Sequence, residues 1–409
     1  MKITRKLGLK PGETAPVALA FLYFFFLLAS YYVIRPVRDE MAIQAGLDQL
    51  QWLFTATFGA MLAFVPLFGY VSTRFPRRIL VPLIYLFFAA GLMVFYGCFS
   101  LLDDIGWAAR IFYVWVSVYN LFVVSVFWSF VSDIFHRDQG KRLFGLIAAG
   151  GSLGAVVGPS LAAWLAQTLG VASLLLVAVV LLLGANAMVV LLNRHQGGSD
   201  EQGPALHGGI LDGALLLGRS RFLQGVAVFI WLYTTLATFL YFQQAHLVAG
   251  AFEDSADRTS VFAAIDLVVN LLTVGIQFFI VGRLMNRAGL GITLAAVPVC
   301  LVLGFTALAA VPSVAALISV QIMRRAGNYG ITRPAREVLY TTVERDARYK
   351  AKNFIDTVVY RGGDALAGWL FTLLKFLGLG IGGIALLSIP LAMIWGWIGY
   401  RLGRKADAG

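Results

Sequence analysis

The sequence has little charge, few cysteines and few histidines for its length. Of its 409 residues, 13% are charged and 59% are apolar, and the apolar residues form long runs. A soluble domain needs a far more polar surface, and about twenty apolar residues are enough to cross a hydrocarbon core. The composition therefore excludes a soluble domain and predicts an integral membrane protein with many spans.

The residues that build metal centres and catalytic sites are also scarce. Cys98 and Cys300 lie inside apolar runs and the four histidines are scattered, so we expect no disulfide framework, metal site or cofactor. No set of nucleophile, base and orienting group stands out, and we do not expect an enzyme. The net charge of +11 is typical of loops that face anionic lipid, so we expect no nucleic-acid partner.

Twelve apolar segments predict an all-α membrane protein. They lie at 16–36, 50–72, 79–101, 108–133, 143–167, 171–192, 222–246, 259–283, 290–311, 313–335, 352–376 and 380–402. The first is too long for the core of a cleaved signal peptide, so we expect a retained helix.

A glycine-rich polar stretch, NRHQGGSDEQGPALHGG, follows the sixth segment. It predicts an N-terminal six-helix bundle (1–192), a linker (193–221) and a C-terminal six-helix bundle (222–409). Lysines and arginines concentrate in the N-terminal tail and in the connections that lead from even to odd segments. By the positive-inside rule, both termini and the linker are expected in the cytoplasm.

Two short loops repeat at the same position in the two halves: GYVSTRFPRR (69–78) and GRLMNRAG (282–289). Their glycines and arginines of interest are Gly69, Arg74, Arg77, Arg78, Gly282 and Arg287. Both loops resemble the cytoplasmic signature of the major facilitator superfamily, in which the glycine permits close helix contact and the arginine caps a helix end. With twelve segments and a central linker, they predict two pseudo-symmetric bundles of the major facilitator type.

Charged residues inside the spans form four clusters, and each charge costs roughly 2.5–3.5 kcal/mol on insertion scales. The first cluster is YYVIRPVRDEM, where Arg35, Arg38 and Asp39 share one helix face. The arginine fork suits phosphate or carboxylate. Two interpretations stay open: an interfacial stop with local Arg–Asp pairing, or the lining of a cavity that holds an anion.

The second cluster, FWSFVSDIFHRDQGKRLFGLIAAGGSLG (127–154), carries Asp133, Lys141 and Arg142 around the turn between segments four and five. Its basic residues are either positive-inside anchors or ligand groups. Three glycines, at 150, 151 and 154, predict close packing of the fifth helix.

The third cluster is a polar stripe of Asp266, Asn270 and Gln277 on the eighth segment. A stripe of this kind forms helix–helix hydrogen bonds or, at Asp266, carries a proton or pairs with a substrate-binding cation.

The fourth cluster spans residues 324–369. Arg324 and Arg325 interrupt the tenth segment, and Gly327, Gly330 and Pro334 predict a break or kink below them, as in helices that line transporter sites. The remaining charges singled out here are Glu337, Asp356, Arg361 and Asp364, with Arg345, Arg348, Lys350 and Lys352 expected in a solvated loop.

PAREVLYTTVERDARYKAKNFIDTVVYR resembles a stretch of the nucleotide transporters of the ATP:ADP antiporter family, known from plastids and intracellular bacteria. The matching residues are Pro334, Arg336, Glu337, Tyr340, Lys350, Lys352, Ile355 and Asp356. Two further stretches are similar to that family through Phe127, Trp128, Phe130, Lys141, Arg142 and Phe144, and through Arg35, Arg38 and Asp39. The resemblance implies alternating access and exchange or uptake of nucleotides, with basic groups that hold phosphates.

Together these features favour a monomeric secondary transporter of the bacterial inner membrane that moves an anionic, phosphorylated solute, with ATP/ADP exchange first. The candidate substrate-binding residues are Arg35, Arg38, Arg324, Arg325 and Arg361. The candidate counter-charges, gate partners or proton sites are Asp39, Asp133, Asp266, Asn270, Glu337, Asp356 and Asp364. Two alternatives remain: a proton-coupled transporter of amphiphilic, drug-like or lipid-like molecules around Asp266, and a non-transporting membrane scaffold or sensor.

Overall fold

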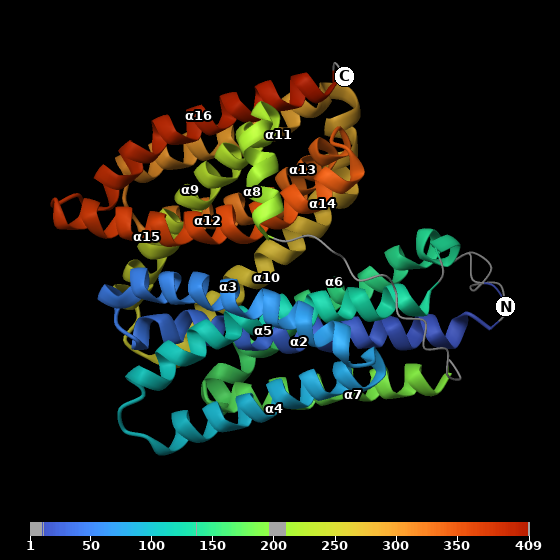
Figure 1. Cartoon of the computed structure of the whole chain (residues 1–409). Coiled ribbons are helices and arrows are strands. Elements are labelled where there is room, and N and C mark those ends of the chain that lie inside the picture. Colours follow the sequence, from blue (N-terminus) through green and yellow to red (C-terminus); the bar gives the residue numbers. More distant parts are fainter. Residues whose placement is uncertain (1–9, 11, 136, 196–209, 408–409) are drawn as a thin grey trace. The chain divides into compact units, whose positions relative to one another are not determined.

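The chain folds into long helices (Figure 1). The computed structural model describes residue 10 and residues 12–135, 137–195 and 210–407, and no strand occurs among them. The helices are α2 (Thr14–Gln44), α3 (Leu50–Arg74), α4 (Arg77–Leu101), α5 (Gly106–Ile134), α6 (Arg137–Leu169), α7 (Ser173–His195), α8 (Ile210–Arg219), α9 (Arg221–Ala251), α10 (Ser255–Ile276), α11 (Gly282–Ala310), α12 (Val314–Gly327), α13 (Arg333–Thr341), α14 (Arg345–Phe354), α15 (Tyr360–Phe376) and α16 (Ile381–Asp407).

Three π-helical turns continue helices that would otherwise end. Gln277–Val281 joins α10 to α11, Asn328–Thr332 joins α12 to α13, and Ile355–Val359 joins α14 to α15. The second of these lies where the glycines and the proline predicted a break or kink. The helix is therefore not broken there but loosened by one wider turn, a feature often found at functional sites.

The prediction of an all-helical membrane protein with twelve spans in two bundles is confirmed. Among the described residues, nine helical stretches are long and apolar enough to cross a membrane, and one of them runs from Ser255 to Ala310. That stretch holds two predicted spans, which Gly289 separates with φ 76° and ψ 171°. Only glycine adopts this conformation without strain, so Gly289 ends one span and begins the next.

The helices form two compact units. The first unit is Met1–Ala45, Ala63–Ala205 and Glu253–Leu267, and the second is Gly46–Leu62, Leu206–Phe252 and Val268–Gly409. The division falls inside α3 and α10, so each of these helices contributes to both units. The boundaries 1–192, 193–221 and 222–409 stay a prediction. The predicted linker contains α8, and its residues 196–209 lie outside the described residues.

In the first unit, α2 packs along α6 and α7 (Figure 1). A Cβ atom added to Gly150 or Gly154 of α6 would lie 2.3 Å from the carbonyl oxygen of Phe21 or Phe25. The two backbones approach so closely that only glycine fits, which confirms the predicted close packing of the fifth span. This contact fixes α2, the helix that carries the first cluster of charges.

In the second unit, α11 lies along α16, and α9 packs against α15 and α16 (Figure 1). Buried apolar side chains such as Phe229, Leu294, Phe305 and Trp395 form its core. This apolar core takes its side chains from α9, α11, α12, α13 and α16, and it packs beside Arg324 and Arg336 on α12 and α13.

Candidate functional site

The first unit holds a set of charged side chains at the end of α2. The Nε atom of Arg35 lies 3.5 Å from Oδ2 of Asp266 on α10. Arg38 donates to Oδ1 of Asp39 from Nε and Nη2, at 3.1 and 2.7 Å. The Arg38 guanidinium also lies 5.1 Å from the ring centroid of Tyr113 on α5. The structure thus pairs both predicted substrate-binding arginines of α2 with carboxylates.

The first unit also contains an ion pair between Glu40 and Arg258 that was not predicted from the sequence. Arg258 of α10 donates to both carboxylate oxygens of Glu40, from Nε at 2.8 Å and from Nη2 at 2.7 Å. The Glu40 side chain is 0% exposed and that of Arg258 is 10% exposed. The two residues are 218 positions apart, and Arg258 follows an acidic loop, so no local pattern marked it.

The charges of this cluster balance. Arg35, Arg38 and Arg258 face Asp39, Glu40 and Asp266. A balanced set of buried ion pairs carries no net charge for a ligand, although it specifies how α2 and α10 pack. For Arg38, the local Arg–Asp pairing is therefore the interpretation that the structure favours.

The second unit holds a different arrangement around Arg324 on α12. Arg324 donates to Oε1 of Gln321 at 3.0 Å and to the Tyr233 hydroxyl on α9 at 3.1 Å. It is only 6% exposed, yet no carboxylate of the described residues forms an ion pair with it. Both of its partners are neutral. The adjacent Arg325 is equally buried.

Close to this arginine, α15 contributes Arg361 and Asp364. Their ion pair is long, with Nη1 3.5 Å from Oδ2, and Thr238 of α9 donates to Oδ1 of Asp364 at 3.2 Å. The Asp364 carboxylate is 13% exposed. It is held less tightly than Glu40, so it can exchange partners at a smaller cost.

A third arginine of this unit, Arg336 on α13, also pairs with a carboxylate. Its Nη2 atom lies 3.1 Å from Oδ1 of Asp356, which is in the π-helical turn Ile355–Val359. Lys352 contacts Glu337 at 2.6 Å, and both of these side chains are more than a third exposed. Arg336 is a further residue that was not among the candidates. Its only signal was its place in the stretch that resembles nucleotide transporters.

The second unit brings Arg324, Arg336 and Arg361 together with two aspartates: Arg336 pairs with Asp356, and Arg361 pairs with Asp364. Arg324 differs from the other two arginines, because its hydrogen-bond partners among the described residues, Gln321 and Tyr233, are neutral.

The third cluster divides between the two units. Asp266 belongs to the first unit, and Asn270, which is 7% exposed, belongs to the second. Gln277 donates to the carbonyl oxygen of Tyr329 at 3.2 Å, which ties together two of the π-helical turns. The polar stripe is thus used in part for contacts between helices.

The loop motifs hold helix ends in place. Arg77 at the start of α4 bonds to Asp133 near the end of α5, and both side chains are about one third exposed. Arg142 donates to Glu13 at 2.9 Å. Asp133 is therefore a structural partner of the first loop.

One expectation about these loops is wrong. A Cβ atom added to Gly69 or Gly282 meets no described atom within 4 Å, so neither glycine marks a close helix contact. Each lies on an exposed helix face, where the absence of a side chain is not required by packing. The Arg74 guanidinium lies 4.6 Å from the ring centroid of Tyr70, and Arg287 is exposed.

Two lysines complete the predicted set. The Lys141 side chain lies outside the described residues. The carbonyl oxygen of Lys350, on α14, approaches α8 so closely that a Cβ atom on Gly213 would lie 2.5 Å from it. The stretch expected to be a solvated loop is therefore the helix α14, which packs against α8.

Long apolar helices, with a π-helical turn that follows the buried Arg324 and Arg325, thus make up a helical membrane protein. The sequence matches the Major Facilitator Superfamily over residues 19–340. The chain therefore belongs to this superfamily, and it is a transporter rather than an enzyme.

Solved transporter structures share this fold. The POT family transporter PepTSo matches with a TM-score of 0.70 and 12% identity, over 96% of this chain and 98% of that chain. A bacterial homologue of the iron transporter ferroportin, in an inward-facing state, matches at 0.66 and 13% identity, over 98% and 100%. The nucleoside transporter NupG matches at 0.62 and 12% identity, over 97% and 99%. A comparison with curated proteins finds no match.

Proposed function

We propose that this secondary transporter moves an anionic, phosphorylated solute by alternating access, with nucleotide exchange such as ATP against ADP favoured. The observation that carries the proposal is Arg324. It is buried on a membrane-spanning helix and held by a glutamine and a tyrosine instead of a carboxylate. A bound anion would supply the missing negative charge.

The neighbouring groups support an anion of more than one charge. Arg325 lies beside Arg324, and Arg361 lies in a long pair with Asp364. A phosphate group accepts two parallel hydrogen bonds from each guanidinium fork, so a polyphosphate matches several arginines at once. Binding would replace the weak Arg361–Asp364 contact with stronger charge-assisted bonds.

The choice of a nucleotide rests on the resemblance to the ATP:ADP antiporter family, in which Arg336 and Asp356 fall at matching positions. The solved structures named above include a nucleoside transporter beside peptide and iron transporters. They support transport of small molecules in general, and the buried Arg324 with its neutral hydrogen-bond partners favours an anion.

We also propose that the protein lies in a bacterial inner membrane as a monomer with both termini in the cytoplasm. The support is the concentration of lysine and arginine in the N-terminal tail and in one set of connections, as the positive-inside rule expects.

The proposal is tested by uptake of labelled ATP into proteoliposomes that contain or lack ADP. We expect uptake that requires internal ADP and that falls about ten- to a hundredfold in Arg324→Gln, since a hydrogen bond to a charged group is worth roughly 1.5–3 kcal/mol. Arg283→Gln is the matched control, because Arg283 is exposed and donates to the carbonyl oxygen of Phe279 on its own helical stretch.

Absence of uptake with either loading, from folded protein, would remove the nucleotide assignment. Equal uptake by wild type and Arg324→Gln would remove Arg324 from the site.

The amphiphile alternative centres on Asp266, which is 1% exposed and lies beside Arg35. Transport that is lost in Asp266→Asn but kept in Arg324→Gln would favour this alternative. The scaffold alternative requires an interior without charged side chains that come together. The second unit has several such side chains, among them Arg324, Arg361 and Asp364.

A further inference from the structure

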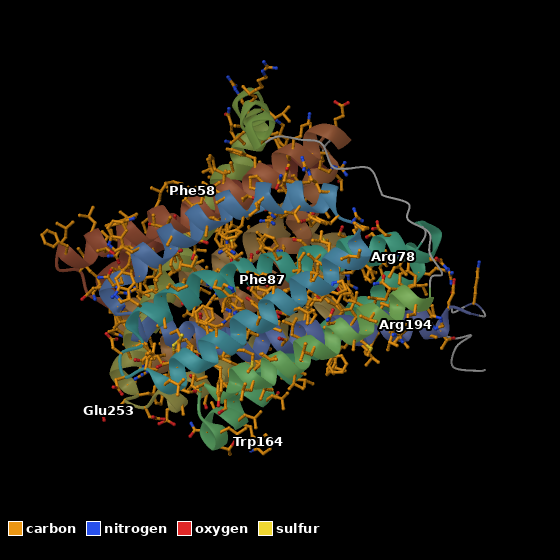
Figure 2. All side chains as sticks on the ribbon, turned by 60° about the horizontal axis from the view of Figure 1, so that its bottom comes forward. Phe58, Arg78, Phe87, Trp164, Arg194 and Glu253 are labelled. Carbon is orange, nitrogen blue, oxygen red and sulfur yellow. The ribbon has the colours of Figure 1, made fainter. Side chains whose placement is uncertain are left out.

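A groove lies between the start of α2 and the end of α7, within the first unit and remote in sequence from the arginines of α12. Its volume is about 480 Å³. The residues that line it are Ala15, Ala18, Leu19, Leu191, Arg194 and His195. Figure 2 labels Arg194 at the end of α7.

The helical period explains the shape of the groove. Ala15, Ala18 and Leu19 stand at i, i+3 and i+4 on one face of α2, so the two alanines leave a hollow in front of the leucine. Leu22 continues this face and is 38% exposed. The apolar floor therefore extends for about 10 Å along α2, at 1.5 Å per residue.

On α7 the same spacing joins an apolar residue to two basic ones. Leu191 is 41% exposed, and Arg194 and His195 follow it by three and four positions in the last turn. The groove therefore has an apolar floor and a basic mouth, and the mouth lies at a helix end, where a span meets the membrane surface.

The basic side chains at the mouth of the groove are Arg194 and His195. Within the described part of the chain, neither Arg194 nor His195 forms a hydrogen bond or an ion pair. Glu13 comes just before α2, but its carboxylate is held by Arg142 and Gln139. Cations in the last turn interact favourably with the helix dipole. The interaction with the helix dipole accounts for basic residues at the end of α7, but it does not account for the apolar groove beside them.

We propose that this groove binds an anionic membrane phospholipid. Its phosphate would contact Arg194 and His195, and an acyl chain would lie along Ala15, Ala18 and Leu19. Basic pockets between membrane-spanning helices are known to hold anionic headgroups. The site is independent of the transported solute, because it uses none of the residues assigned to that solute.

The test is retention of lipid by the purified full-length chain, measured by native mass spectrometry during titration with phosphatidylglycerol or phosphatidylcholine. Wild type is expected to retain phosphatidylglycerol preferentially. Arg194→Gln should weaken retention about fivefold, at about 1 kcal/mol per arginine near the surface. His195→Gln should weaken retention by a smaller factor, and the double variant should weaken it more than either single variant.

Two further variants separate the groove from general attraction between charges. Ala18→Trp fills the apolar floor and keeps both basic side chains, so it should also reduce retention of phosphatidylglycerol. Arg404→Gln removes an exposed arginine from the last turn of α16 and should change nothing. Glycerol 3-phosphate has the headgroup charge without acyl chains and should not compete.

Equal retention of the two lipids by wild type would overturn the proposal. So would full retention in Ala18→Trp, or an effect of Arg404→Gln as large as that of Arg194→Gln. Displacement of the lipid by glycerol 3-phosphate would show a site for a free phosphate group and would also overturn it.

Discussion

The ion pair between Glu40 and Arg258 gives the sharpest prediction about stability. Both carboxylate oxygens of Glu40 accept from one guanidinium, and Gln44 donates to Oε1 at 2.9 Å. Glu40→Gln would leave Arg258 buried without its charged partner. Breaking a buried pair in this way typically costs about 3–5 kcal/mol.

The assay is unfolding in detergent followed by tryptophan fluorescence, with Glu337→Gln as the matched control. Glu337 also pairs with one basic residue, but its side chain is 47% exposed, so its loss should cost no more than about 1 kcal/mol. In the double variant Glu40→Gln/Arg258→Gln, the loss should be smaller than the sum of the two single losses. A Glu40→Gln loss as small as that of Glu337→Gln would refute the assignment of a desolvated ion pair.

Two further predictions concern the first unit. Hydrogen bonds from Arg142, from the Lys10 backbone N–H and from Gln139 lower the pKa of Glu13 from 4.5 to about 2. The stability that Glu13 contributes should therefore be complete above the pKa of Glu13 in the unfolded chain, and it should be lost as the pH falls through about 2. The measurement is the difference in unfolding free energy between wild type and Glu13→Gln as a function of pH. Gly154→Ala places a Cβ atom 2.3 Å from the Phe25 carbonyl oxygen and should cost about 1–3 kcal/mol, whereas Gly145→Ala, which meets nothing within 4 Å, should be tolerated in the same unfolding assay.

The helices could be predicted because the bilayer imposes their length and composition. Each predicted span falls on an observed helix, since a backbone in lipid must satisfy its hydrogen bonds within the segment. The π-helical turn Asn328–Thr332 was signalled by its glycines and the following proline. The turn Ile355–Val359 had no such signal, and α8 lies where a polar linker was expected.

The partners of the charged residues could be predicted only when they were local. Arg38 with Asp39, and Arg361 with Asp364, are neighbours on one helix. Glu40 with Arg258 depends on how two distant helices pack, which periodicity does not encode. For this reason the sequence suggested an anion site on α2, where the structure shows carboxylate partners for both Arg35 and Arg38.

The most direct test of the central claim is equilibrium binding of labelled ATP to purified protein, comparing Arg324→Gln with Arg35→Gln. Arg324 donates its hydrogen bonds, within the described residues, to the neutral Gln321 and Tyr233, whereas Arg35 lies beside Asp266. We predict that Arg324→Gln weakens binding at least about tenfold, and that Arg35→Gln has the smaller effect. A larger loss in Arg35→Gln, with Arg324→Gln binding as well as wild type, would contradict the account.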